Sequence, residues 1–476
     1  MATAEIGVIG LAVMGANLAL NIAEKGYKVA VFNRTTARTR EFAASAGALA
    51  DQVVPCETLE DFVAAIRPPR PVIIMVKAGE PVDQQIAALK PLMAANDIII
   101  DAGNANFRDT MRRFKELDGS GLTFIGMGVS GGEEGARNGP SIMVGGAEAS
   151  WKRVEPVLTA ISAKFKGEAC AAWLGENGAG HFVKTIHNGI EYADMQMIAE
   201  IYGIMRDRLG MDAATMAGIF SAWSSGPLDS FLIDITAEVL KAADPATGKP
   251  IVDLILDAAG QKGTGRWSVI ESQMMGVPAT AIEAAVAARS LSAMLDERRA
   301  AERILGLPRA PELSGDVAAF VADLEKALLA GKVAAYAQGF AVMAAASREF
   351  GWSLPMPVIA KIWRAGCIIR SRFLDEIASA FSADPDISNL ALTPAFSKLI
   401  GETDGALRRV VADAVTSGMP APALASAISY FDTLRRSRGT ANLIQAQRDF
   451  FGAHGFRRLD DGSGGDHHGP WGGAHG

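Results

Sequence analysis

Five side chains between Lys184 and Tyr192 carry the most reactive combination of groups in this sequence. Lys184, His187, Asn188, Glu191 and Tyr192 are spaced i, i+3, i+4, i+7 and i+8, so they would share one face of a helix that turns by about 100° per residue. A solvated surface face is the alternative, whereas a core-facing stripe would be apolar. An amine and a carboxylate on one face are suited to acid and base roles, and burial would lower the pKa of the lysine.

A glycine-rich turn near the N-terminus predicts a dinucleotide site. The apolar run Ile6–Ile9 leads directly into Gly-Leu-Ala-Val-Met-Gly, residues 10–15, and then into a helix from about Ala16. Gly10 permits the tight turn, Ala12 still lets the backbone approach a pyrophosphate, and Gly15 allows close helix packing. The phosphates would lie at the helix N-terminus. A plain strand-to-helix connection is the alternative.

The end of the next predicted strand favours NADP over NAD. Val29–Phe32 is followed by Asn33, Arg34 and Thr35, where NAD enzymes usually carry an acid for the ribose 2′-hydroxyl. A guanidinium suits a 2′-phosphate, because it forms charge-assisted bidentate bonds. Lys77 follows another strand, where it is either a ligand or a solvated loop charge. The predicted cofactor residues are Gly10, Leu11, Ala12, Val13, Met14, Gly15, Asn33, Arg34, Thr35, Val76, Lys77, Ala78 and Asn104.

Three further loops offer groups that could hold a polar, anionic substrate. Asn104 follows a strand and would lie at the same edge of the sheet, where its amide could orient a hydroxyl or the nicotinamide. Ser130, Gly131 and Gly132 combine a hydroxyl with unhindered backbone amides, which suits a carboxylate, although a plain turn is the alternative. Residues 260–266 supply two cations and a hydroxyl for a phosphate monoester, without the spacing of a P-loop.

The elements that must position these groups change in type along the chain. Short apolar runs alternate with helical stretches in the first part, which predicts a parallel α/β sheet. After about Gly180 the sequence consists of long Ala- and Leu-rich helical patterns, and from Gly462 it has too few apolar residues to bury a core. We expect an α/β Rossmann-type dinucleotide-binding domain over residues 1–178, a large all-α domain over 179–440, and an extended, flexible C-terminal tail over 441–476. The predicted strands are Ile6–Ile9, Val29–Phe32, Val72–Val76, Ile98–Asp101 and Thr123–Ile125.

The composition limits the kinds of partner and compartment. Among 476 residues, 46 Lys and Arg stand against 53 Asp and Glu, and a net charge of −7 argues against nucleic-acid binding. Cys56, Cys170 and Cys367 are too far apart for a zinc cluster and too few for a disulfide framework, which favours the reducing cytoplasm. The apolar stretch from Ile6 to Ala23 has no basic region before it, so we expect neither a targeting peptide nor a membrane span. No metal-ligand spacing is present, so we expect no metal.

Six motifs in this order resemble those of the decarboxylating 6-phosphogluconate dehydrogenases. They are GLAVMG, FNRT, VSGGEEGARNGPS, HFVKTIHNGIEY, GQKGTG and QAQRDFFGAH, and together they span nearly the whole chain. The chain length is similar to that of the long, dimeric branch of the family. The resemblance implies oxidative decarboxylation of 6-phospho-D-gluconate to D-ribulose 5-phosphate with NADP, a reaction of the pentose phosphate pathway.

The resemblance also implies roles for individual residues. Lys184 would take the C3 hydroxyl proton, and Glu191 would protonate the enediol formed after carbon dioxide leaves. Arg448 and His454 would act in the partner subunit's active site, so a homodimer with shared sites is implied, and no metal is needed. The carboxylate and hydroxyl end of the substrate would contact Ser130, Gly131, Gly132, His187 and Asn188, with Asn104 bridging to the cofactor; the phosphate end would contact Tyr192, Lys262, Thr264 and Arg289.

Several positions depart from the family pattern, and two other functions compete. Ala102, Ala105, Met127 and Arg266 replace the usual residues, and the end of the chain from Trp471 to His475 matches only loosely, which bears on substrate affinity and tail docking. One alternative is a β-hydroxyacid dehydrogenase of the 3-hydroxyisobutyrate type, against which the phosphate-pocket cations argue. The other is a non-catalytic NADP-binding paralogue, against which the retained lysine and glutamate argue.

Overall fold

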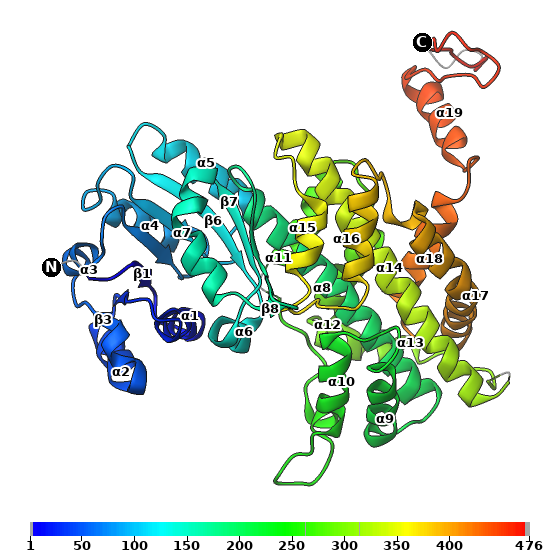
Figure 1. Ribbon diagram of the computed structural model, residues 1–476. Coiled ribbons are helices and arrows are strands. Elements are labelled where there is room, and N and C mark those ends of the chain that lie inside the picture. Colours follow the sequence, from blue (N-terminus) through cyan, green and yellow to red (C-terminus); the bar gives the residue numbers. More distant parts are fainter. Residues whose placement is uncertain (1–2, 262, 314, 472–476) are drawn as a thin grey trace. The chain divides into compact units, whose positions relative to one another are not determined.

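The N-terminal part of the chain forms an eight-stranded sheet (Figure 1). The structure is a computed structural model that describes residues 3–261, 263–313 and 315–471. Neighbouring strands are parallel except β6 and β7, so β7 and β10 run against the other six. The predicted parallel α/β architecture is confirmed, with one reversed edge. In spatial order the strands are β10 (Ala171–Gly175), β7 (Ile142–Gly146), β6 (Thr123–Val129), β5 (Ile98–Asp101), β4 (Pro71–Ile74), β1 (Ile6–Ile9), β2 (Val29–Phe32) and β3 (Val53–Pro55).

Helices cover both faces of this sheet, because the strands are apolar on both faces. One apolar layer lies under α1 (Val13–Glu24), α2 (Thr36–Ser45) and α7 (Glu148–Ile161). The opposite layer lies under α3 (Leu59–Ala65), α4 (Glu80–Leu89) and α5 (Phe107–Leu117). Helix α1 begins at Val13, three residues before the predicted start. A 3-10 helix, η1 (Gly47–Gln52), a short helix, α6 (Gly132–Asn138), and a two-stranded hairpin of β8 (Lys164–Phe165) and β9 (Glu168–Ala169) complete this part.

The predicted helical domain is confirmed and is built around α8 (Ala179–Gly203) and α14 (Val317–Phe350). A buried ion pair joins these two helices: Lys332 Nζ lies 2.7 and 2.5 Å from the carboxylate oxygens of Asp194. Helix α14 is long and apolar enough to cross a membrane by length and composition, but 89% of its most apolar window is buried, as in a core helix. The other elements are η2 (Ile204–Arg208), α9 (Ala213–Trp223), α10 (Phe231–Lys241), η3 (Ile251–Leu254), α11 (Thr264–Met274), α12 (Thr280–Ser292), α13 (Leu295–Leu305), α15 (Met356–Ile362), α16 (Leu374–Ala383), η4 (Leu390–Leu392) and α17 (Pro394–Ser417).

The chain divides into two compact units, residues 1–427 and 428–476, and α18 (Pro422–Leu434) leads from the first into the second. In the second unit, the buried carboxylate of Asp449 on α19 (Ala441–Gly452) accepts hydrogen bonds from the backbone N–H groups of Gly455 and Gly469, at 2.9 and 2.8 Å. His468 Nδ1 and the Trp471 indole N–H contact the same carboxylate at 2.7 and 2.6 Å. These bonds hold the pKa of Asp449 well below its usual range. The sequence predicts a flexible tail, whereas the described part of it is tied to this carboxylate.

Candidate active site

Helix α8 packs directly against strands β6 and β7. A Cβ atom added to Gly128 on β6 would lie 2.5 Å from the Lys184 Cβ atom, and one added to Gly180 would lie 2.5 Å from the Gly126 carbonyl oxygen. Glycines therefore let the first turns of α8 approach the strands at backbone distance. As a result Lys184 lies against β6, close to the end where Ser130 follows the strand, and is only 6% exposed.

A chain of hydrogen bonds runs through the predicted polar face of α8. Ser130 Oγ lies 3.2 Å from His187 Nε2, and His187 Nδ1 lies 3.1 Å from Asn188 Oδ1. The Asn188 amide then donates to Thr264 Oγ1 at 2.9 Å, and Lys184 Nζ lies 3.5 Å from His187 Nδ1. A neutral imidazole carries one N–H, so if Nδ1 donates to Asn188, Nε2 accepts from Ser130. The predicted helical face thus joins Ser130 and Thr264 into one buried network.

Burial favours the neutral form of each titratable group in this network. It lowers the pKa of Lys184, and the Glu191 carboxylate partly opposes that change. It also holds the pKa of His187 well below its usual range, and the nearby Lys184 lowers it further. Burial raises the pKa of Glu191, against the opposing effect of Lys184 and Arg289. A neutral amine can accept a proton and a neutral carboxyl can donate one, which is what acid and base roles require.

Glu191 and Tyr192 continue the face toward a second part of the site. Glu191 Oε2 lies 3.7 Å from His187 Nδ1, and its side chain is 20% exposed. The Arg289 guanidinium lies over the Tyr192 ring, 3.7 Å from its centroid, in a cation–π contact. Gly265 on α11 faces the same ring, since an added Cβ would lie 2.4 Å from it. The structure therefore brings Thr264, Tyr192 and Arg289 to one end of the polar face.

The predicted dinucleotide turn has the geometry that a pyrophosphate requires. Gly10 has φ +96°, and a Cβ there would lie 2.4 Å from the Met75 carbonyl oxygen, so a side chain is excluded. Ala12 caps α1 and is exposed, which leaves the helix N-terminus open to an anion. The Asn33 side chain accepts from the Leu11 N–H at 3.1 Å and so ties this turn to the end of β2. Arg34 and Lys77 follow β2 and β4 with exposed side chains. This arrangement fits a phosphorylated dinucleotide.

Two more predicted loops end at the same side of the sheet. Asn104 is exposed between β5 and α5, and Gly131 caps α6 with φ +105°. Gly132 is also exposed at the start of α6, so its backbone amide is unhindered. Among the departures from the family pattern, Ala102, Ala105 and Met127 are at most 3% exposed and fill the core, whereas Arg266 is exposed on α11.

Three predicted residues are not placed in this cluster. Lys262 lies outside the described residues. Arg448 and His454 belong to the second unit, where Arg448 donates to Gln445 Oε1 at 3.0 Å and the His454 ring packs edge-on against Phe451. Over residues 3–261, 263–313 and 315–471, no group of three or more His, Cys, Asp or Glu side chains is arranged to hold a metal ion.

The structure adds residues that the sequence did not single out. His181 lies one turn before Lys184, and its Nδ1 lies 2.7 Å from Thr110 Oγ1. The Trp363 ring packs edge-on against His187, with centroids 5.5 Å apart. Burial raises the pKa of the Cys367 thiol, which interacts with Lys184, to about 12. The helical period that selected Lys184 also reaches His181, but no sequence signal points to Trp363 or Cys367.

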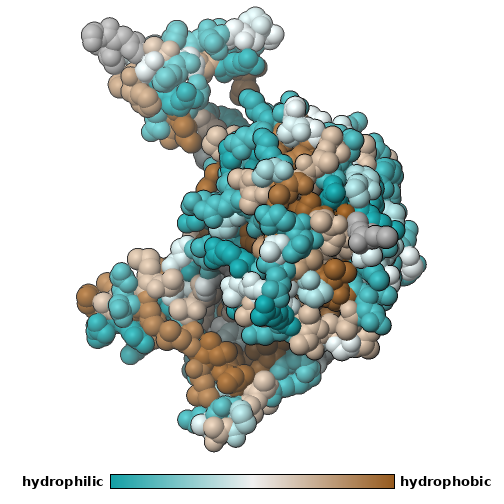
Figure 2. All heavy atoms as spheres, turned by 90° about the vertical axis from the view of Figure 1, so that its left-hand side faces the viewer, coloured by the Kyte–Doolittle hydropathy of each residue, from teal (hydrophilic) through white to brown (hydrophobic). Residues whose placement is uncertain are grey.

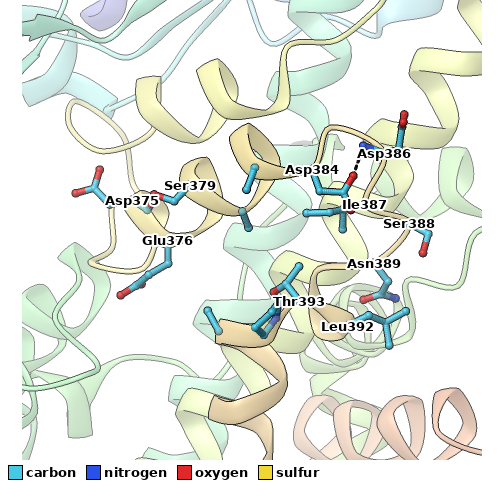
Figure 3. A pocket seen from close by; sticks show the side chains of 14 residues that line it. Asp375, Glu376, Ser379, Asp384, Asp386, Ile387, Ser388, Asn389, Leu392 and Thr393 are labelled. Atoms are coloured by element: carbon cyan, nitrogen blue, oxygen red, sulfur yellow. Dashed lines mark hydrogen bonds between the residues drawn. The ribbon is translucent and has the colours of Figure 1, made fainter.

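A surface cavity of about 640 Å³ lies apart from this cluster, on α16 and the segment that leads to α17 (Figure 3). Its rim carries the carboxylates of Asp375, Glu376, Asp384 and Asp386. Acidic walls repel a substrate that carries a carboxylate and a phosphate. The cavity is therefore a poor site for the anionic substrate that the sequence predicts.

Comparisons with known proteins point to one enzyme family over nearly the whole chain. Residues 5–175 match the NAD binding domain of 6-phosphogluconate dehydrogenase, and residues 180–471 match its C-terminal domain. A 6-phosphogluconate dehydrogenase, decarboxylating, of Synechococcus elongatus is 49% identical, covering 99% of this chain and 100% of the relative. The NADP(+)-dependent enzyme of Bacillus subtilis is 48% identical over 97% of this chain and 98% of its own. The structure of Plasmodium falciparum 6-phosphogluconate dehydrogenase, described in its apo form and with NADP+ or 6-phosphogluconate, superposes with a TM-score of 0.94 at 39% identity, covering 98% of this chain and 100% of that chain.

Proposed function

This chain belongs to the 6-phosphogluconate dehydrogenase family, and on that premise we propose how its residues carry out the family's reaction. The protein is an NADP-dependent oxidoreductase that oxidises and decarboxylates 6-phospho-D-gluconate, yielding D-ribulose 5-phosphate, carbon dioxide and NADPH. Full-length similarity to decarboxylating relatives favours this function over a 3-hydroxyisobutyrate-type dehydrogenase and over a non-catalytic paralogue.

Lys184 is the base and Glu191 the acid of the proposed mechanism. The observation that carries this assignment is a buried lysine on the same helix face as a largely buried glutamate, with burial favouring the neutral form of both. Neutral Lys184 removes the proton of the C3 hydroxyl as that carbon is oxidised. Bound NADP would accept the hydride from C3. The resulting ketone is β to the carboxylate and accepts the electrons released with carbon dioxide, while protonated Lys184 donates its proton to the ketone oxygen. Glu191 then protonates the enediol carbon that lost carbon dioxide, and neutral Lys184 takes back the proton of the C3 hydroxyl, which gives the ketose.

The hydrogen-bond chain suggests how the two ends of the substrate are held. If Thr264 Oγ1 accepts from Asn188, the hydroxyl proton of Thr264 is free to donate to a phosphate oxygen. The guanidinium of Arg289, held over Tyr192, adds positive charge at the same end. At the other end, Ser130 and the backbone amides of Gly131 and Gly132 meet the carboxylate, with His187 and Asn188 behind them. Lys262 and Asn104 complete the proposed set, the latter between substrate and cofactor.

NADP is assigned to the edge of the sheet formed by the turn after β1. The open N-terminus of α1 meets the pyrophosphate, and Arg34 with Thr35 and Asn33 meets the 2′-phosphate. Val76, Lys77 and Ala78 line the same edge after β4. The full proposed set for the turn is Gly10, Leu11, Ala12, Val13, Met14 and Gly15.

The function is tested by initial rates with 6-phosphogluconate as substrate. NADP or NAD is supplied in parallel reactions, and the absorbance of the reduced cofactor is followed. Lys184→Ala should lower kcat at least about 100-fold, as expected for loss of a general base, and leave the Kd of NADPH near the wild-type value. Normal turnover by this variant would refute the proposed role of Lys184. A wild-type protein that folds and binds NADPH but does not release carbon dioxide would favour the non-catalytic paralogue.

We also propose a cytoplasmic homodimer whose subunits share active sites, with domains at residues 1–178, 179–440 and 441–476. Helix α19 supports the shared sites, since four of its apolar side chains are at least half exposed: Leu443, Ile444, Phe450 and Phe451. Hydrophobic side chains also gather in patches on the face shown in Figure 2. Exposed apolar surface of this kind is typical of protein interfaces. The three cysteines are free and buried, which supports a reducing compartment.

Mixing two inactive variants tests the sharing. If Arg448 and His454 act in the partner's site, Lys184→Ala and Arg448→Ala subunits should form mixed dimers with one intact site each. Random exchange should then restore about a quarter of the wild-type activity. No recovery, although exchange is seen by native mass spectrometry, would place Arg448 outside the partner's site.

A further inference from the structure

One buried guanidinium holds two of the loops that carry proposed cofactor residues. Arg113 lies on α5 and is 1% exposed. Its Nη2 atom donates to the Gly79 carbonyl oxygen at 3.0 Å, and its Nε and Nη2 atoms contact the two oxygens of Asp83 at 2.7 and 3.2 Å. Its Nη1 atom donates to Asp101 Oδ2 at 3.2 Å. The loop after β4 and the end of β5 are therefore joined through a single side chain.

These contacts lie next to the proposed ligands in both loops. Gly79 directly follows residues 76–78, has φ +91° and caps α4. Asp101 is the last residue of β5, and its other oxygen accepts from the Gly103 N–H at 3.1 Å, immediately before Asn104. A shift of the guanidinium would be transmitted to the backbone on both sides of the cofactor edge.

Helix α5 also contacts α8, the helix that carries the proposed base. Thr110 lies one turn before Arg113, and its hydroxyl contacts the buried His181 ring at 2.7 Å. His181 in turn lies one turn before Lys184 on α8. The same helix that holds the cofactor loops thus has a polar contact with the helix that carries the proposed base.

We propose that Arg113 is a positioning residue for NADP, which sets the relative placement of residues 76–78 and Asn104 without contacting the reacting atoms. The proposal rests on the function assigned above. The planar, five-donor fork of arginine makes these four hydrogen bonds to three residues in fixed directions, whereas the ammonium of lysine acts as a compact point charge with three donors. Two carboxylates, Asp83 and Asp101, compensate the buried positive charge.

The same sheet contains a matched control at its opposite end. Arg70 immediately precedes β4 and Asp97 immediately precedes β5, so this pair joins the amino ends of the two strands that Arg113 joins at their carboxyl ends. Arg70 Nη1 donates to Asp97 Oδ2 at 3.0 Å, and Asp97 is fully buried. Arg70→Lys therefore removes a similar fork from the same strands, away from the proposed NADP edge.

The experiment compares Arg113→Lys, Asp83→Asn and Arg70→Lys with wild-type protein. For each protein we would measure kcat, KM for NADP, KM for 6-phosphogluconate, the Kd of NADPH by fluorescence, and Tm. Arg113→Lys should raise KM for NADP and Kd for NADPH by about tenfold and change KM for 6-phosphogluconate by less than about threefold. Asp83→Asn should act in the same direction to a smaller extent. Arg70→Lys should lower Tm comparably and leave both cofactor constants unchanged.

Two results would overturn the proposal: unchanged NADP constants in Arg113→Lys, or an equal rise in Arg70→Lys. If Arg113→Lys fails to fold, Asp83→Asn decides, because Asp83 is 35% exposed and its loss leaves Arg113 paired with Asp101. NADPH binding is measured without turnover, so Arg113 can be tested even if wild-type protein does not oxidise 6-phosphogluconate.

Discussion

Gly128→Ala should impair catalysis although residue 128 is assigned no contact with the substrate. An added Cβ would lie 2.5 Å from the Lys184 Cβ atom and 3.0 Å from its Cγ atom. Carbon atoms in contact are about 3.5–4.0 Å apart, so Lys184 must move by about 1 Å. A misplacement of about 1 Å can cost about 100-fold in rate, so we expect kcat to fall by about that factor. Overpacking should also lower the free energy of unfolding by about 1–3 kcal/mol.

The assay combines kcat from NADPH absorbance with the Kd of NADPH and denaturant unfolding, and Gly7→Ala is the control. A Cβ at Gly7 on β1 would lie 2.4 Å from Ile66 and Phe62 side-chain atoms, in the apolar layer under α3. This variant should lose similar stability and keep kcat within about threefold of wild type, because its overpacked neighbours are not part of the site. The reasoning is refuted if Gly128→Ala keeps wild-type kcat, or if Gly7→Ala loses kcat as severely.

Three further predictions concern charged groups. Arg34→Ala should raise KM for NADP at least about tenfold more than KM for NAD, because it removes a charge-assisted contact to the 2′-phosphate; equal losses would contradict this. Glu191→Gln should lower kcat at least about 100-fold and leave NADPH binding near normal, because it removes the proton that the proposed acid donates. Wild-type kcat in this variant would count against Glu191 as the acid. Burial raises the pKa of Glu200 from 4.5 to about 7, although it accepts from the backbone N–H groups of Ala423 and Leu424. A carboxyl whose pKa is higher in the folded protein than in the unfolded chain contributes its full stability below the unfolded-state pKa. That contribution is lost as the pH rises through the folded-state pKa. Glu200→Gln should therefore gain stability relative to wild type between about pH 4.5 and about pH 7, by up to about 3 kcal/mol in denaturant unfolding, and a pH-independent difference would disprove it.

Most of the sheet could be predicted because its strands are local apolar runs. Three strands, β1, β2 and β5, lie at the predicted residues. Strands β3, β7 and β10 are not among the predicted strands. Strand β7 ends in Gly-Gly and β10 begins with Ala-Ala, residues with weak strand preference. They are strands because neighbouring strands pair with them, and the antiparallel pairing of β6 with β7 likewise depends on tertiary context.

The arrangement of the candidate site could be predicted where one helix carries its residues, and not where distant segments meet. Helical spacing alone groups Lys184 with His187 and Glu191. The contacts of Ser130 with His187 and of Asn188 with Thr264 join segments 57 and 76 residues apart, which no period in the sequence encodes. The tail illustrates the same limit: its composition predicts flexibility, but composition does not reveal that Asp449 can bind four donors at once.

Burying several titratable side chains on the polar face of α8 costs folding free energy, and the structure shows how that cost is reduced. Charges buried without partners destabilise a fold, so Lys184, His187 and Glu191 are acceptable mainly in neutral forms or with nearby partners. The pKa shifts caused by burial favour those forms, and the hydrogen bonds from Ser130 through His187 and Asn188 to Thr264 give the neutral polar groups partners. Lys184 and Thr264 keep hydrogen-bonding capacity within this chain, one beside the proposed site of oxidation and one at the proposed phosphate end. The same burial that threatens stability therefore shifts Lys184 and Glu191 toward the neutral forms that the proposed base and acid need.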